Sequence, residues 1–277
     1  MYVNIKSLYY GQILILGKSN VGKSTLINTL IGKKISIISH KINTTNYNIV
    51  GLYNNNSYQI KYIDTPGNIF SNNKILNLLK NNEFNFILFI LDRNRWNYIE
   101  EKFLKILNKT NIPIIVVINK IDKIKNKNIL LPYINFIKKK IKIFFLFIVS
   151  AKYKLHTNII NNFICKNLPK KKHHYPKNYI TNQTEEFIIK EMIRENIIKY
   201  IHKELPYLIY IKINYPQKIK IIKNQIQVLF LVNNLNQKKI IIGKNATKLK
   251  LIKYKSEQNI KKFFKRKINL QIWVQIK

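Results

Sequence analysis

The stretch Gly17–Ser24 constrains the fold of this chain more than any other segment. It reads GKSNVGKS and matches the pattern G-x-x-x-x-G-K-[ST]. An apolar run that ends at Leu16 precedes it, so the motif lies between an expected strand and an expected helix. Glycines let successive backbone N–H groups point into one concavity, and the positive end of the helix attracts an anion. The stretch predicts a polyphosphate site, with an ordinary glycine-rich turn as the alternative for the motif alone.

The residue types within this stretch predict how a phosphate chain would be bound. Lys23 reaches the β and γ phosphates, and the Ser24 hydroxyl is a ligand of Mg2+. Backbone N–H groups of the other members line the concavity. The expected nucleotide-binding residues here are Gly17, Lys18, Ser19, Asn20, Val21, Gly22, Lys23 and Ser24.

A second motif is expected to complete the phosphate end of the site. It follows an apolar run, so it lies at the end of an expected strand. Its carboxylate can bind Mg2+ through water, and the backbone N–H of its glycine can meet a γ-phosphate and so sense hydrolysis. An ordinary turn is the alternative for this motif alone. The motif residues are Asp64, Thr65, Pro66 and Gly67.

The polar segment between these two motifs fits a switch loop. It has no helical period and contains Thr44 and Thr45. We expect one of these hydroxyls to complete the magnesium shell while a γ-phosphate is present and to leave it after hydrolysis. A solvated loop explains the remaining residues of the segment.

Two further strand ends carry groups that distinguish guanine from adenine. The Asp122 carboxylate can accept hydrogen bonds from the ring N–H and the amine of guanine, and the Ala151 N–H can donate to its carbonyl oxygen. Adenine reverses donor and acceptor there, which costs about 1 to 3 kcal/mol for each buried group left unpaired. The sequence therefore predicts GTP/GDP rather than ATP. The expected residues are Asn119, Lys120, Asp122, Ser150, Ala151 and Lys152.

The distribution of apolar runs predicts two domains. Between residues 11 and 168, strand patterns alternate with helical patterns, which indicates a mostly parallel sheet covered on both faces. Pro169 ends the last helix, and no apolar period follows. A second region then reads as a helix that Thr184 caps, strands over 207–215 and 225–242, a basic helix over 247–267 and a strand over 270–276. We expect domains at 1–169 and 184–277, joined by a linker at 170–183.

The charge of the chain suggests a polyanionic partner, either nucleic acid or an anionic membrane surface. The formal net charge is +38, but AT-biased coding DNA would also produce it, since only four of the 50 basic residues are arginine. The longest apolar runs, 112–118 and 143–149, are too short to cross a bilayer, and the start of the chain lacks a signal-peptide pattern. We expect a cytoplasmic monomer.

The motifs together resemble the Era family of Ras-like GTPases, in the TrmE-Era-EngA superfamily. The resemblance covers essentially the whole chain and is carried by GKSNVGKSTLIN, KISIISHKINTTNYNIVG, YIDTPG, VINKID, VSAK, HHYPKNYIT and IREN. It implies an α/β P-loop G domain followed by an α+β type II KH domain that binds small-subunit (16S) rRNA near its 3′ end. It also implies a GTP-hydrolysing switch in assembly of the small ribosomal subunit, with peripheral attachment to the cytoplasmic side of the inner membrane.

Such KH domains bind the RNA backbone at a GXXG loop that opens a helix. The matching segment lies between an expected strand and the basic helix, and Ala246 replaces the second glycine. A Cβ there either blocks the close approach of a phosphate or costs about 1 kcal/mol if φ is positive. We expect weaker RNA binding than a glycine would give. The expected RNA-binding residues are Gly243, Lys244, Asn245, Ala246, Lys248 and Lys250.

Hydrolysis is expected to depend on groups around the γ-phosphate. In related GTPases an asparagine at the position of Asn20 helps to bind a potassium ion (K+) that neutralises charge in the transition state. The expected catalytic residues are Asn20, Lys23, Thr44, Thr45 and Gly67. Two other functions remain open: a GTP-binding scaffold on RNA that hydrolyses slowly, and a tRNA-modifying GTPase of the same superfamily. The second is disfavoured because the KH-like segment follows one complete G domain.

Overall fold

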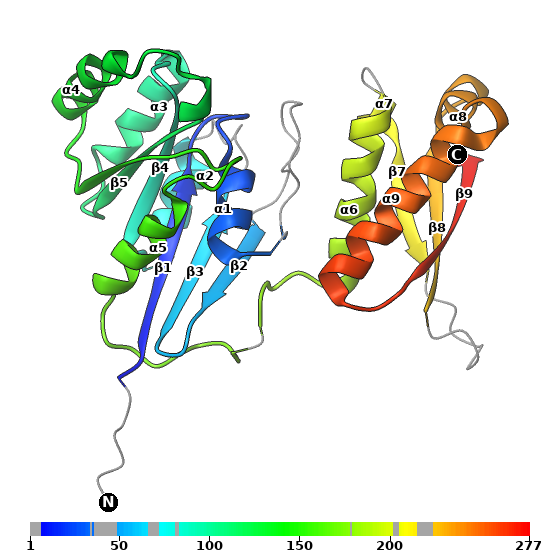
Figure 1. The fold of residues 1–277 in the computed structure, drawn as a ribbon, viewed down its shortest axis with the longest axis horizontal. Helices are drawn as coiled ribbons and strands as arrows, with labels where there is room; N and C mark the ends of the chain where they lie inside the picture. Colours follow the sequence, from blue (N-terminus) through cyan, green and yellow to red (C-terminus); the bar gives the residue numbers. More distant parts are fainter. Residues whose placement is uncertain are drawn as a thin grey trace, which may run out of the picture. The chain divides into compact units, whose positions relative to one another are not determined.

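The computed structural model describes residues 7–33, 35, 49–65, 72–80, 83–177, 179–201, 205–214 and 224–277. The chain forms two compact units, the first ending at Asn182 and the second beginning at Gln183. Figure 1 shows each unit as a sheet with its own helices. Four expected site residues lie outside the described residues: Thr44, Thr45, Pro66 and Gly67.

The first unit contains a six-stranded sheet in the order β2-β3-β1-β4-β5-β6 (Figure 1). Neighbouring strands run parallel except β2 and β3, which are antiparallel. The mostly parallel sheet is therefore as expected. The strands are β1 Tyr9–Leu16, β2 Ile49–Asn54, β3 Tyr58–Asp64, β4 Phe86–Asp92, β5 Ile114–Asn119 and β6 Phe145–Ile148.

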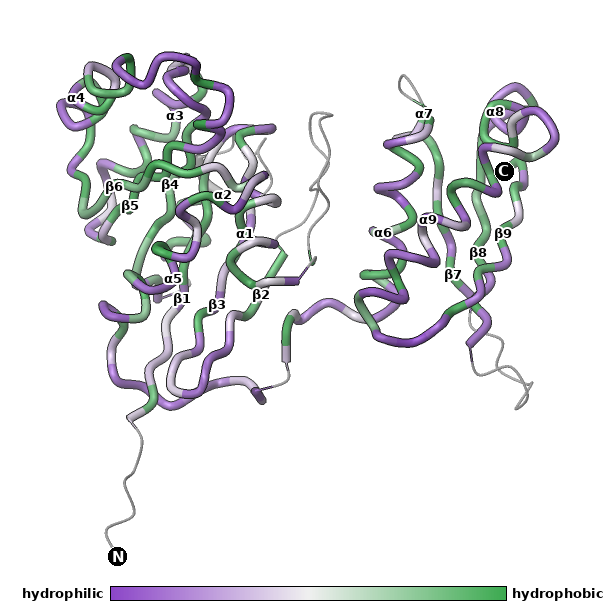
Figure 2. Tube along the Cα trace, in the orientation of Figure 1, coloured by the Kyte–Doolittle hydropathy of each residue, from purple (hydrophilic) through white to green (hydrophobic). Residues whose placement is uncertain are grey.

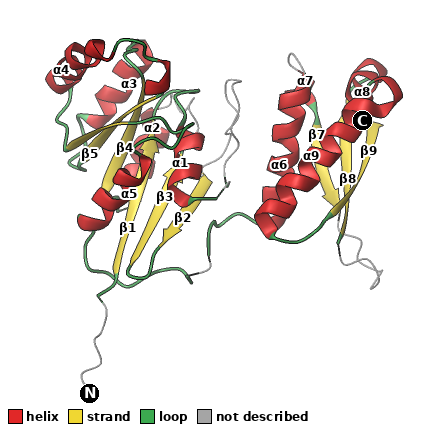
Figure 3. Ribbon diagram, in the orientation of Figure 1, coloured by secondary structure: helices red, strands yellow, loops and turns green. Residues whose placement is uncertain are grey.

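Helices cover both faces of this sheet (Figure 3). Leu14 and Leu16 of β1 belong to one apolar cluster with residues of α2, α3 and α4, whereas Ile13 and Ile15 are buried outside that cluster. Side chains alternate between faces along a strand, so the two sets mark opposite faces. On the second face α1 packs against α5 and β2. The helices are α1 Lys23–Ile31, α2 Asn72–Lys80, α3 Tyr98–Leu107, α4 Leu130–Lys140 and α5 Thr157–Lys166.

Hydropathy follows this layering. The central strand β4 is buried along its whole length, and Figure 2 shows it as largely hydrophobic. The surface helix α4 alternates between hydrophilic and hydrophobic residues in the same figure. Within the described part of the chain, no helix combines the length and the apolar character needed to span a bilayer.

Within the first unit, residues 170–177 and 179–181 contact the chain at β1, β2 and β3. Thr181 forms an isolated antiparallel bridge with Gly51 of β2, and its hydroxyl donates to the carbonyl oxygen of Val50 at 2.6 Å. The N–H of Leu52 donates to the carbonyl oxygen of Ile180 at 2.7 Å. Because β2 is the last strand of the sheet on its side, these contacts cover part of an otherwise open edge.

The second unit contains a three-stranded sheet in the order β7-β8-β9. β7 (Tyr210–Asn214) is antiparallel to β8 (Gln225–Val232), and β8 is parallel to β9 (Asn269–Ile276). Buried and less buried residues alternate along β7 and β8, so one face of the sheet forms the core. The helices are α6 Glu185–Tyr200, α7 Leu205–Leu208, α8 Leu235–Ile242 and α9 Thr247–Phe264.

Two expectations about this unit need correction. The strand expected over 225–242 ends at Val232, and residues 235–242 form the helix α8. Asn234 is the physical reason, because its side chain accepts a hydrogen bond from the N–H of Gln237 at 2.9 Å. Gln237 in turn accepts from the N–H of Asn233 at 2.9 Å, which fixes the backbone just before the helix. The strand expected over 207–215 is shortened by α7.

Candidate functional site

The motifs meet at one edge of the first sheet. In the parallel register Ile15 lies beside Asp64, and Asp92 beside Asn119. The carboxyl ends of β1, β3, β4, β5 and β6 therefore point the same way, and each expected motif follows one of them. This geometry joins segments that are far apart in the sequence.

Two glycines of the stretch Gly17–Ser24, from here called the phosphate cradle, occupy places that other residues cannot. Gly17 has φ 152°, and a Cβ there would lie 2.6 Å from the carbonyl oxygen of Ile90. Gly22 has φ 100°, and a Cβ would lie 2.3 Å from Nδ2 of Asn119. Both contacts are closer than real Cβ atoms allow. The cradle thus needs these glycines for its conformation and for its packing.

Lys23 lies at the start of α1 and is only 6% exposed. Its ammonium donates to the carbonyl oxygens of Gly17 at 2.8 Å and Lys18 at 3.0 Å. Burial lowers the pKa of Lys23 to about 8, and the nearby charge of Asp64 opposes this fall. Because burial disfavours an unpaired ammonium, the negative charge of a phosphate beside Lys23 would stabilise its charged form.

Ser24 and Asp64 come together from different motifs. The Ser24 hydroxyl donates to Oδ2 of Asp64 at 3.2 Å, and Asp64 is fully buried. Thr65, the next residue, donates from its hydroxyl to the carbonyl oxygen of Ile15 at 2.8 Å, which joins the ends of β3 and β1. Hydroxyl and carboxylate oxygens are the ligands that Mg2+ prefers, so this donor set fits the expected ion.

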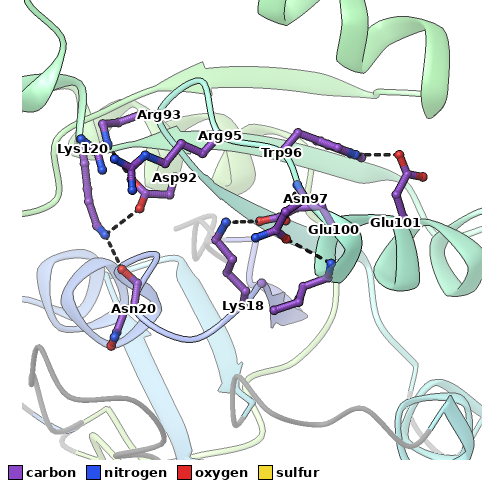
Figure 4. Close-up of polar contacts among 12 residues, drawn as sticks. Lys18, Asn20, Asp92, Arg93, Arg95, Trp96, Asn97, Glu100, Glu101 and Lys120 are labelled. Atoms are coloured by element: carbon purple, nitrogen blue, oxygen red, sulfur yellow. Dashed lines mark hydrogen bonds and ion pairs between the residues drawn. The ribbon is translucent and has the colours of Figure 1, made fainter.

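The segment Asn119-Lys120 contacts the phosphate cradle directly. The Asn119 amide donates to the carbonyl oxygen of Val21 at 2.8 Å. Lys120 donates to the carbonyl oxygen of Asn20 and pairs with Asp92 at 3.1 Å (Figure 4). Asn20 has φ 64°, a left-handed conformation that asparagine adopts more readily than most residues. The end of β5 therefore fixes the backbone of the cradle.

The groups expected to read the base lie beside one another. The Ser150 hydroxyl donates to Oδ1 of Asp122 at 2.5 Å. The Ala151 N–H donates to Oδ1 of Asn119 at 3.0 Å, so in this structure that N–H already has an acceptor. The exposed Lys152 places its ammonium 4.9 Å from the centroid of the Tyr153 ring.

Two acidic residues of the site were not anticipated from the sequence. Asp92 ends β4 and pairs with Arg93 and Lys120. Glu100 of α3 pairs with Lys18 of the cradle at 2.8 Å. The pattern Asn97-x-x-Glu100 could have indicated a helix start, but it carries no signal that the carboxylate contacts another segment.

The second unit carries the GXXG-like loop, and the elements around it differ from those expected. The loop was expected between a strand and the basic helix, but it lies between two helices, α8 and α9, because residues 235–242 form α8. Gly243 has φ 72° and Ala246 has φ 60°. The positive φ therefore gives Ala246 the expected backbone strain. Lys244, Asn245 and Lys250 are exposed, whereas Lys248 is half-buried, and its Cγ would lie 3.0 Å from a Cβ at Gly243.

Comparisons with known proteins agree with both halves of this description. The family described as 50S ribosome-binding GTPase matches residues 12–120, and the KH domain family matches residues 196–277. GTPase Era of Buchnera aphidicola (strain APS) is 44% identical over 99% of this chain and 100% of its own. GTPase Era of Histophilus somni (strain 129Pt) is 35% identical over 97% of this chain and 92% of its own.

Two solved structures are similar over almost the whole chain. A single-residue variant of Aquifex aeolicus Era bound to GDP.AlF4- superposes with a TM-score of 0.85, at 33% identity, over 98% of this chain and 94% of its own. Era in complex with MgGDPNP and nucleotides 1506–1542 of 16S ribosomal RNA superposes with a TM-score of 0.84, at the same identity and coverage. The chain thus belongs to the Era family of GTPases, with a G domain followed by a KH domain.

Proposed function

We propose that this Era-family GTPase uses its nucleotide state to control binding of its KH domain to 16S rRNA near the 3′ end, during assembly of the small ribosomal subunit. The observation that carries the proposal is the convergence of the phosphate cradle, the Ser24–Asp64 pair and the base-reading groups at one sheet edge, in a chain that also carries the GXXG-like loop. A similar Era structure contains both MgGDPNP and that part of 16S rRNA.

In this proposal each group acts through an interaction that its position allows. Backbone N–H groups of the cradle bind the α and β phosphates, and Lys23 exchanges its carbonyl partners for phosphate oxygens. Ser24 and Asp64 would hold Mg2+, the first directly and the second through water. When bound, the ion neutralises charge that develops on the phosphates. Thr65 fixes the end of the strand that carries Asp64.

The γ-phosphate distinguishes the two states of the switch. We assign its recognition to Gly67 and to Thr44 or Thr45, whose contacts would form only with GTP. Asn20 is assigned to a K+ ion at the phosphates, which would lower the barrier to hydrolysis. Turnover that is several-fold faster in potassium than in sodium supports this role of Asn20, and equal turnover rejects it.

The KH domain is assigned the RNA contact. The loop Gly243–Ala246, in which Gly243, Asn245 and Ala246 have positive φ, suits an RNA backbone, as do the exposed Lys244 in the loop and Lys250 in the first turn of α9. We extend the same proposal to oligomeric state and membrane contact. The protein is proposed to be a cytoplasmic monomer that attaches peripherally to the anionic inner membrane. Sedimentation with anionic and with neutral vesicles tests the membrane contact, because only anionic vesicles should bind.

One titration tests the central proposal. A 3′-end fragment of 16S rRNA is titrated with protein bound to GDP or to a non-hydrolysable GTP analogue, over a range of salt concentrations. The proposal expects affinity that depends on the nucleotide and exceeds the affinity for a scrambled RNA. If both RNAs bind equally in both nucleotide states, with the same steep salt dependence, binding is due only to the basic charge of the chain and the proposal is rejected. GTP turnover measured alongside distinguishes a switch from a slow scaffold, and Lys23→Ala should abolish that turnover.

A further inference from the structure

Lys18 and Glu100 form an ion pair that the P-loop pattern does not require. Their charged atoms Nζ and Oε1 lie 2.8 Å apart, and Figure 4 shows the two side chains pointing toward each other. The Lys18 side chain is 14% exposed and the Glu100 side chain 1%. Position 18 is an unspecified residue of the pattern, so its side chain is not explained by phosphate binding.

Glu100 is fixed by its own helix. Its Oε2 accepts a hydrogen bond from the N–H of Asn97 at 3.1 Å, and the Asn97 side chain caps the same helix at the N–H of Ile99. The carboxylate therefore has one oxygen on the start of α3 and the other on Lys18. A buried carboxylate with one cationic partner orients that partner strongly, because separating them leaves a buried charge.

The backbone of the cradle has contacts of its own, including one at Lys18. The Lys18 carbonyl oxygen accepts from Lys23 at 3.0 Å. The carbonyl oxygens of Asn20 and Val21, further along the cradle, accept from Lys120 and Asn119. The cradle is thus attached to β5 near its centre and to α3 near its start.

We propose that Glu100 is a positioning residue for nucleotide binding: through Lys18 it fixes the start of the phosphate cradle relative to α3. This inference rests on the proposed phosphate-binding role of Gly17–Ser24. It adds a second attachment of the cradle, from a helix with no guanine-nucleotide motif. The pair holds backbone N–H groups in the direction of the phosphates, whether the nucleotide is GDP or GTP.

The mechanism predicts a split between binding and turnover. A misdirected cradle weakens contacts to phosphates that both nucleotides share, so the affinities for GDP and GTP should fall together. Such uniform losses raise KM and leave kcat at saturating GTP nearly unchanged. A purely structural pair would instead lower the melting temperature without changing the rate at which the folded protein releases GDP.

Glu100→Gln is the primary test, in the full chain. Glutamine can still accept from the Asn97 N–H, so the helix start is kept while the charge opposite Lys18 is lost. We expect the GDP dissociation rate to rise about tenfold, KM for GTP to rise similarly, and kcat to stay within about threefold. Lys18→Met should give the same change, whereas Lys18→Arg keeps the positive charge and should keep most of the wild-type affinity. The double variant Glu100→Gln/Lys18→Met should bind nucleotide no more weakly than either single variant.

Glu101→Gln is the matched control, because Glu101 is the neighbouring carboxylate of α3 and pairs with Lys140 and Trp96 at the surface. It should release GDP at the wild-type rate. A dissociation rate within twofold of wild type in folded Glu100→Gln, or an equal rise in Glu101→Gln, would overturn the inference. If Glu100→Gln does not fold, Lys18→Met and Lys18→Arg decide by the same criterion. Lys23→Ala separates the two proposals, since wild-type nucleotide affinity in that variant would reject the phosphate site itself.

Discussion

The side-chain amide of Asn119 donates a hydrogen bond to the carbonyl oxygen of Val21 at 2.8 Å, and thereby joins β5 to the phosphate cradle. Its Oδ1 accepts from the N–H groups of Lys120 at 2.8 Å and Ala151 at 3.0 Å. One buried side chain thus joins the phosphate cradle to both segments expected to bind the base. We expect Asn119→Ala to lower the free energy of unfolding by about 2 to 4 kcal/mol, because it leaves buried groups unpaired.

Urea unfolding without nucleotide checks that change, and fluorescent GDP titration should show affinity at least about a hundredfold weaker. Asn108→Ala is the control, because Asn108 is the C-cap residue of α3, at the opposite end of that helix from Glu100. Wild-type GDP affinity in Asn119→Ala would contradict the role of these three hydrogen bonds.

Asp122→Asn should change base preference rather than abolish binding. One oxygen of Asp122 accepts from the Ser150 hydroxyl at 2.5 Å, which orients the carboxylate. Guanine presents two donors, its ring N–H and its amine, and a carboxylate can accept from both. The asparagine amide can accept from only one of them, because its NH2 group is a donor and would face the other. Xanthine carries a carbonyl oxygen in place of the guanine amine and restores the match. We expect GDP affinity to fall by about a hundredfold and XDP affinity to rise, as measured by competition against fluorescent GDP.

Gln59→Leu should release the segment that precedes the second unit. The fully buried Gln59 side chain accepts from the N–H groups of His174 at 2.9 Å and Tyr175 at 3.0 Å, and donates to the Tyr175 carbonyl oxygen at 2.9 Å. Leucine fills the volume but leaves these backbone groups without a partner, at a cost of about 2 to 4 kcal/mol. Hydrogen exchange of residues 173–181 should accelerate in this variant, while the exposed Asn56→Ala should leave it unchanged.

The strand-end motifs were predictable because a parallel sheet places them together. Once β1 and β3 are recognised as neighbouring parallel strands, Asp64 must lie near the cradle that follows β1, and the structure places its Oδ2 3.2 Å from the Ser24 hydroxyl at the end of the cradle. The Lys18–Glu100 pair was not predictable, since it depends on how α3 packs. No local pattern relates these two residues.

In the second unit, the prediction of a strand over 225–242 was wrong for a different reason. Residues 240–242 are three isoleucines that favour a strand, and they follow a genuine strand pattern. The structure makes them part of α8, where Ile241 is fully buried in the core. Capping by Asn234 and tertiary packing therefore override the local strand propensity.

Ala246→Gly should stabilise the chain and strengthen RNA binding. Ala246 has φ 60°, where a Cβ is strained, so glycine should raise the free energy of unfolding by about 1 kcal/mol. Removing the Cβ also opens the loop to a phosphate, so affinity for a 16S rRNA 3′-end fragment should rise several-fold. Lys238→Ala, on α8 outside the loop, is the control for RNA binding. Unchanged RNA affinity in Ala246→Gly would mean that the loop does not contact RNA.

Glu191 of α6 should make the stability of the second unit depend on pH. Burial raises the pKa of Glu191 to about 7, although the charges of Arg194, whose Nε lies 3.5 Å away, and of Lys190 oppose the rise. The native state therefore binds a proton more tightly than the unfolded chain does. This contribution to stability is complete below about pH 4.5, where both states are protonated, and is lost as the pH rises to about 7.

Glu191→Gln removes that dependence, because glutamine stays neutral. We expect the variant to be more stable than the wild type by about 2 to 3 kcal/mol at pH 8, and nearly equal to it at pH 4.5. Urea unfolding at both pH values measures the difference, and comparison at each pH cancels the titration of other groups. The exposed Glu186→Gln, on the first turn of the same helix, is the matched control for the loss of a carboxylate from α6. A variant no more stable than wild type at pH 8 would mean that Arg194 compensates fully for the burial of Glu191.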